Sequence, residues 1–103
     1  MIVQVPGQAD FAAEVGTSFD LVAGSEHVPM QLASCEDRGS DERFEQFSLI
    51  FTAPAGAPLQ QGSYAVEHPT LGNLPLFLVP IAGSAEGVTY EAVFSRRRTE
   101  ARQ

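Results

Sequence analysis

Lysine and tryptophan do not occur in this 103-residue sequence, and cysteine occurs once. Residues 1–95 hold two arginines and twelve acidic residues, a formal charge of −10. A body of this charge repels a phosphate backbone, so we expect no nucleic-acid partner. Without tryptophan, the chain also lacks the largest aromatic surface for stacking on a sugar ring.

A single cysteine, Cys35, excludes an intrachain disulfide and a CxxC motif, and it fits a reducing compartment. No stretch approaches the ~20 apolar residues that span a bilayer. The first residues lack the basic segment and the long apolar run of a signal peptide. We therefore expect a cytoplasmic protein with no membrane partner.

Nine glycines and seven prolines indicate many turns between short elements. The length allows one hydrophobic core, so we expect a single β-rich domain over residues 1–103. Four arginines near the end predict a flexible, Arg-rich tail over residues 96–103.

A short N-terminal helix is expected over residues 11–15, with Asp10 as its N-cap and Gly16 ending it. Alternation of apolar and polar residues then predicts strands at 18–23, 28–35, 44–53, 62–68, 74–81 and 89–95. Because no amphipathic helix separates them, the fold class is all-β and mainly antiparallel, a small barrel or sandwich of about six strands.

Two of these strands carry unusual signals. Pro29 removes a ladder donor, which suggests an edge strand or a bulge. The segment 74–81 is apolar on both faces, so we expect a central strand that is covered on both sides.

Only two histidines are present, His27 and His68, and neither lies in a metal-binding spacing. A site of three protein ligands would need both of them with Cys35 or a carboxylate, so we expect no metal and no cofactor. We expect His68 to donate its ring N–H to a backbone carbonyl of the turn that begins at Pro69.

Catalytic patterns are lacking as well: no GxSxG, SxxK or phosphate-binding glycine loop occurs. Glu67 and His68 are adjacent in a strand, so they point to opposite faces and cannot line one site unless a bulge intervenes. Glu67 and Glu91 are expected to face solvent and to protect sheet edges from association. These features predict a protein that is not an enzyme.

The segment 36–43 is the most polar in the chain and is expected to be an exposed loop. Together with the ionisable residues of the strands, it defines the candidate functional surface: Glu36, Asp37, Asp41, Glu42, Glu67, His68 and Glu91.

Four sequence segments follow one another in a distinctive order: Leu59-Gln60-Gln61-Gly62-Ser63-Tyr64, Glu67-His68-Pro69-Thr70-Leu71-Gly72, Leu76-Phe77-Leu78-Val79-Pro80 and Tyr90-Glu91-Ala92-Val93-Phe94. With this pattern the chain resembles an uncharacterised family of small bacterial domains of about this length. Members of that family are often encoded near phage-tail-collar-like genes. The resemblance brings no activity, cofactor or catalytic residue with it.

The first functional hypothesis is therefore a non-enzymatic structural or protein-interaction module, accessory to a phage-tail-like assembly, with a protein partner or self-association. An alternative is a small-ligand or carbohydrate-binding β-barrel with a pocket lined by Tyr64, Phe77 and Tyr90. A third is a hydrolase or metal enzyme that uses His68 with Glu67 or Glu91.

Overall fold

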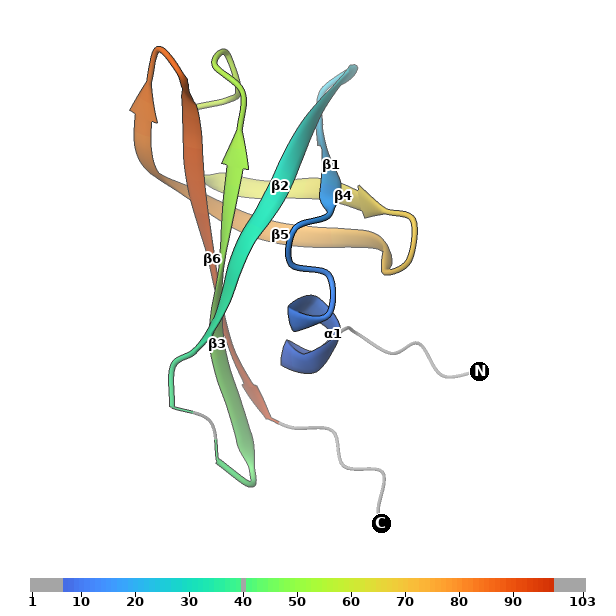
Figure 1. The fold of residues 1–103 in the computed structure, drawn as a ribbon. Coiled ribbons are helices and arrows are strands. Elements are labelled where there is room, and N and C mark those ends of the chain that lie inside the picture. Colours follow the sequence, from blue (N-terminus) through green and yellow to red (C-terminus); the bar gives the residue numbers. More distant parts are fainter. Residues whose placement is uncertain (1–6, 40, 98–103) are drawn as a thin grey trace.

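Six antiparallel strands close into a barrel in the order β1-β2-β3-β6-β5-β4 in the computed structural model, which describes residues 7–39 and 41–97 (Figure 1). Its elements are α1 (Gln8–Ala12), β1 (Ser18–Ala23), β2 (Glu26–Asp37), β3 (Phe44–Ala53), β4 (Gly62–His68), β5 (Gly72–Ser84) and β6 (Gly87–Arg97). The predicted all-β class with one short N-terminal helix is confirmed, and of the two predicted architectures the structure adopts the barrel.

Tight turns connect the hairpins β1–β2, β4–β5 and β5–β6. Gly24, in the turn after β1, has φ +64°, and Gly72, at the start of β5, has φ +82°. Only glycine adopts these values without strain. Pairing of β1 with β4, from Asp20 opposite Glu67 to Val22 opposite Ala65, closes the barrel.

Strand β5 pairs with two neighbouring strands, one after the other along its length. Its first half pairs with β4 as far as Leu78, and its second half pairs with β6 from Val79 onward. The register shifts between Pro80 and Ala82, at a bulge that includes Ile81. Figure 1 shows the strand crossing the barrel and then turning to run beside β6.

Inward-facing side chains from all six strands form the core. In β3, for example, Phe47, Leu49 and Phe51 have no exposed surface, as the alternation predicts. Each fully buried side chain of this kind stabilises the fold by roughly 1.5–3 kcal/mol.

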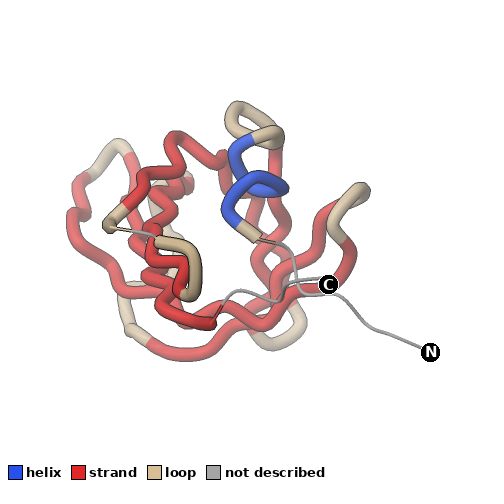
Figure 2. The backbone as a smooth tube through the Cα atoms, turned by 90° about the horizontal axis from the view of Figure 1, so that it is seen from below, coloured by secondary structure: helices blue, strands red, loops and turns tan. Residues whose placement is uncertain are grey.

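Both ends of the barrel are covered. Helix α1 lies at one end (Figure 2). There the Phe11 ring packs against those of Phe19, Phe47 and Phe94, at centroid distances of 6.4, 6.0 and 5.6 Å. At the end of β3 far from α1, the loop 54–61 lies over the core, in which its residue Ala57 is buried. It is held there by Tyr90, whose hydroxyl donates to the carbonyl of Pro58.

The helix differs from its prediction. It begins at Gln8 and ends at Ala12, with Gly7 as the N-cap. Asp10 lies in the first turn, and its carboxylate accepts the Gly7 N–H at 2.9 Å. It therefore caps the helix from the third helical position rather than from the N-cap.

The expectation that residues 74–81 are covered on both faces is wrong. Phe77 and Ile81 are 53% and 52% exposed, whereas Leu74, Leu76 and Leu78 are buried. A barrel wall has one inner face, and no described element covers the outer face of β5.

β2 has a neighbour on both sides, and its register shift lies between Leu32 and Ser34, so the prediction of an edge strand or a bulge at Pro29 is wrong. Pro29 nevertheless lies in the part of β2 that pairs with only one of its two neighbours. It pairs with Asp20 of β1, while pairing of β2 with β3 begins only at Gln31. At the other end of the chain, the backbones of Arg96 and Arg97 belong to β6. The rest of the predicted Arg-rich tail lies outside the described residues.

Candidate functional site

The polar segment 36–43 is built around two carboxylates that order its backbone. Asp37 accepts the Gly39 N–H at 2.7 Å. Asp41 accepts the N–H groups of Arg43 and Phe44, both at 2.8 Å. The prediction of a loop from residue 36 is wrong, because β2 continues through Asp37. All four predicted surface residues of this segment, Glu36, Asp37, Asp41 and Glu42, are exposed, and the carboxylates of Asp37 and Asp41 also hold turns.

Glu91 belongs to an ion-pair network on the outer face of the barrel. Its carboxylate accepts from the Arg38 guanidinium at 3.1 Å, and Arg38 Nε also donates to the hydroxyl of buried Ser48 at 3.0 Å. The predicted role in edge protection is wrong for both Glu91 and Glu67, because β6 and β4 each have a neighbour on both sides. Glu91 instead ties the loop after β2 to β6.

His68 faces the interior, and its side chain is 1% exposed. Ring Nδ1 accepts the backbone N–H groups of Thr70 and Leu71 at 3.0 and 3.1 Å. The ring proton therefore resides on Nε2, which donates to the Thr17 hydroxyl at 3.0 Å. That hydroxyl in turn donates to the carbonyl of Glu14 at 2.7 Å. The prediction that the ring N–H of His68 donates to a carbonyl of the turn is therefore wrong. The ring accepts two N–H groups of the turn, and its own N–H donates to Thr17, in the segment after α1.

Glu67 and His68 lie on opposite faces of β4, as predicted. His68 is buried beside Phe19, with ring centroids 4.2 Å apart, while Glu67 faces outward. With both ring nitrogens engaged, His68 has no free nitrogen for proton transfer to a substrate.

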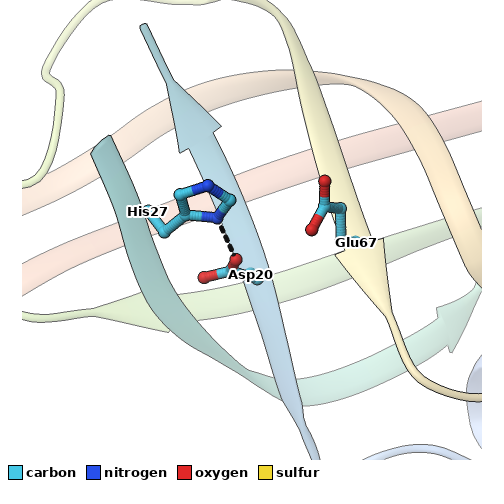
Figure 3. A group of neighbouring side chains, drawn as sticks. All are labelled: Asp20, His27 and Glu67. Atoms are coloured by element: carbon cyan, nitrogen blue, oxygen red, sulfur yellow. Dashed lines mark hydrogen bonds and ion pairs between the residues drawn. The ribbon is translucent and has the colours of Figure 1, made fainter. Parts of the chain in front are cut away.

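Glu67 instead joins two residues that the sequence reasoning did not select, Asp20 and His27. We call these three residues the His27 cluster. One ligand atom from each lies within 4.8 Å of the others. Figure 3 shows Asp20 of β1 between His27 of β2 and Glu67 of β4, with all three on the outer face. The side chains of His27 and Asp20 are 53% and 37% exposed.

Strand register produces this cluster. Asp20 lies directly opposite Glu67, while His27, which pairs with Val22, is the diagonal neighbour of Asp20. His27 Nδ1 is hydrogen-bonded to Asp20 Oδ2. This bond and the charge of Asp20, with a smaller contribution from Glu67, raise the pKa of His27 above 6.5.

The proximity of His27 and Asp20 could have been predicted from the sequence. A two-residue turn at Gly24 and Ser25 fixes the β1–β2 register, which places His27 and Asp20 on one face. The approach of Glu67 depends on the β1–β4 closure, which joins strands that are distant in the sequence.

A second surface feature is an apolar strip on the outer face of β5, formed by Pro75, Phe77, Val79 and Ile81. We call it the β5 strip. Its neighbours on β4 are small and uncharged, since Phe77 pairs with Ser63 and Pro75 with Ala65.

The pocket expected from Tyr64, Phe77 and Tyr90 does not form. Tyr90 is fully buried and Tyr64 is half-buried on the inner face, whereas Phe77 lies on the outer face. A hollow of about 490 Å³ lies elsewhere, beside Ser18, Gln31 and Thr52, and among the described residues of its lining Glu86 alone is ionisable.

Cys35 is half-buried, and its thiol contacts the carbonyl of Gln8 at 3.7 Å. Burial, with smaller contributions from the charges of Glu45 and Asp37, raises the pKa of this thiol. A reactive cysteine needs the opposite shift.

The fold therefore defines a small closed β-barrel whose interior is occupied by its own side chains and whose distinctive features lie on its outer face. The chain belongs to the family described as Domain of unknown function (DUF6916), whose model matches residues 6–94. This confirms the predicted membership of an uncharacterised family of small domains, while the phage-tail gene neighbourhood stays a prediction. No curated protein and no solved structure gives a significant match to the chain.

Among the residues that the structure describes, no helix has the length and apolar character required to cross a membrane.

Proposed function

We propose that this domain is a non-enzymatic protein-interaction module that binds a partner protein through the β5 strip. The observation that carries the proposal is the outer face of β5, where four successive outward positions are apolar. Two of them, Phe77 and Ile81, are more than half exposed. Contiguous exposed apolar surface on a small domain typically marks a site of protein contact.

The fold itself does not require these side chains. The outer face of an antiparallel sheet is commonly polar where it meets water. The core is already supplied by the inward residues Leu74, Leu76 and Leu78 of the same strand. Burial of one Phe side chain at an interface would contribute roughly 1.5–3 kcal/mol before the costs of association.

Charge favours a different protein over a second copy of this chain. Glu67 and Glu91 flank the strip, because Glu67 follows the β4 segment that pairs with it and Glu91 pairs with Val79. Residues 1–95 carry a formal charge of −10. Two such surfaces would repel each other, whereas an apolar patch rimmed by basic residues would fit.

The groups that could support catalysis are engaged elsewhere. Asp37 and Asp41 accept backbone N–H groups, Glu91 pairs with Arg38, and both ring nitrogens of His68 are hydrogen-bonded. These engagements support a role in binding rather than in reaction chemistry.

The resemblance of the sequence suggests where the partner is encoded. We propose an accessory role in a phage-tail-like assembly and a cytoplasmic location, which the free thiol of Cys35 fits. The neighbouring gene products are therefore the partners to test.

The experiment is co-expression of the tagged full-length chain with each neighbouring gene product, followed by co-purification. Phe77→Asp is the test variant, and Val15→Asp is the matched control, since Val15 is 43% exposed and lies outside β5. We expect the wild type and Val15→Asp to retain a partner that Phe77→Asp loses. Failure of the wild-type chain to retain any neighbouring product, or equal retention by both variants, would overturn the proposal.

A further inference from the structure

We propose that Asp20, His27 and Glu67 form a binding site for one divalent transition-metal ion of the Zn²⁺ class on the outer face of the barrel. The proposal is independent of the β5 strip. It rests on one imidazole nitrogen and two carboxylates from three strands, with one ligand atom from each within 4.8 Å of the others.

The register of the sheet gives an independent reason to expect a cation here. Asp20 and Glu67 are directly opposite each other on β1 and β4. Like charges at directly opposite positions destabilise a sheet. The two described arginine side chains do not relieve this repulsion, because Arg38 pairs with Glu91 and Arg43 lies in the turn before β3.

Glu67 differs from the other two members of the cluster in its contacts. Asp20 is bonded to His27, but among the described side chains the Glu67 carboxylate makes no hydrogen bond or ion pair. It nevertheless lies beside that pair in Figure 3. A metal ion would bring this carboxylate and the His27–Asp20 pair into one coordination sphere.

The geometry requires only small side-chain movements. Ligand atoms about 2.1 Å from a tetrahedral zinc ion lie roughly 3.4 Å from one another. His27 Nδ1 and Asp20 Oδ2 would separate from their hydrogen bond, while Glu67 would approach. Because His27 and Asp20 are partly exposed, rotamer changes can supply these shifts without disturbing the core.

The donor set selects the class of ion. Imidazole nitrogen suits zinc and other first-row transition metals, whereas Mg²⁺ and Ca²⁺ prefer oxygen ligands alone. Three protein ligands on the outer face of the barrel leave a fourth position open to water or to another donor.

A protonated His27 is the competing account of the same geometry. One imidazolium ion can offset the repulsion between Asp20 and Glu67 without any metal. The two accounts differ in what Glu67 does, since only the metal site makes its carboxylate a ligand.

The test is calorimetric titration of the full chain with ZnCl₂, after treatment with a chelator and its removal, with MgCl₂ as the comparison ion. Glu67→Gln is the test variant. Glu36→Gln is the matched control, because it makes the same chemical change at an exposed residue of β2 outside the cluster. Circular dichroism checks that each variant is folded, and His27→Gln is a second test variant.

We expect one zinc ion per chain, weaker binding of magnesium, and an affinity for zinc that falls about tenfold or more in Glu67→Gln but not in Glu36→Gln. In NMR spectra, zinc should shift the ring resonances of His27 and leave those of His68 in place. The proposal is overturned if millimolar zinc produces no binding heat, which is the result for a protonated His27 alone. Equal losses in the two glutamine variants, which would indicate diffuse binding to surface acids, would also overturn it.

Discussion

At the scale of single residues, the two histidines show how the face of a strand decides the chemistry of a side chain. His68 points inward, where its ring satisfies two backbone donors of the turn after β4. His27 points outward, where it bonds to a carboxylate and remains accessible. One is a structural hydrogen-bonding group, and the other belongs to a candidate binding site.

Replacement of His68 tests its structural role. His68→Ala removes the acceptor for two N–H groups and leaves a cavity beside Phe19, so we expect a loss of about 2–4 kcal/mol in the free energy of unfolding. His68→Asn should lose less, because an amide oxygen can take the place of Nδ1. Urea denaturation measures both, with Leu59→Ala as the control, since Leu59 is 67% exposed and should change stability little. Equal stability of His68→Ala and the wild type would contradict this account.

The pKa of His27 gives a second prediction at this scale. Its folded-state value is raised above 6.5 by the bond to Asp20, so its stabilising contribution is complete below pH 6.5. That contribution is lost as the pH rises through the folded-state value. The stability difference between the wild type and His27→Gln should therefore shrink as the solution becomes more alkaline.

NMR titration of the His27 ring in the presence of a chelator measures this pKa directly. Asp20→Asn removes the largest cause of the shift and should return the value toward 6.5. A wild-type pKa at or below 6.5 would show that the hydrogen bond to Asp20 does not form in solution.

At the scale of elements, helix α1 packs against the core of the barrel through one side chain, that of Phe11. The helix is five residues long, too short to be stable alone, and Phe11 is its one buried residue. Phe11→Ala should cost about 3–5 kcal/mol, because the cavity lies among three aromatic rings. Phe44→Ala is the control, since Phe44 is 44% exposed and should change stability far less. Thermal or urea unfolding measures both, and similar losses in the two variants would show that α1 does not close the barrel.

Strand positions were predictable where alternation was regular and a turn residue marked the end. The bounds of β1, β3 and β4 agree with the predicted ranges 18–23, 44–53 and 62–68. Outside these strands the predictions were less accurate. β2 and β6 extend beyond their predicted ranges, because ladder pairing with β3 continues through polar residues such as Glu36 and Arg96.

Features that depend on long-range pairing could not be read from the sequence. Alternation does not reveal which distant strands meet, so neither the β1–β4 closure nor the approach of Glu67 to Asp20 was predicted. Apolar residues on both sides of residues 74–81 suggested a covered strand, because sequence pattern alone does not separate a buried face from an exposed apolar one.

At the scale of the whole molecule, side chains fill the interior of the barrel, so we expect a binding surface on its outer face. Loop 54–61 and α1 cover the two ends, and the apolar β5 strip lies on a body whose formal charge over residues 1–95 is −10. This combination is the basis for proposing a partner with an apolar patch and a basic rim.

The most direct measurement is the affinity of the full chain for the neighbouring gene product with which it co-purifies. Calorimetric titration would compare the wild type, Phe77→Asp and the matched control Val15→Asp, each shown to be folded by circular dichroism. We predict that Phe77→Asp weakens binding about tenfold or more, equivalent to ~1.4 kcal/mol, while Val15→Asp binds as the wild type does. Equal affinities for the three proteins would contradict the proposal that the β5 strip is the interaction surface.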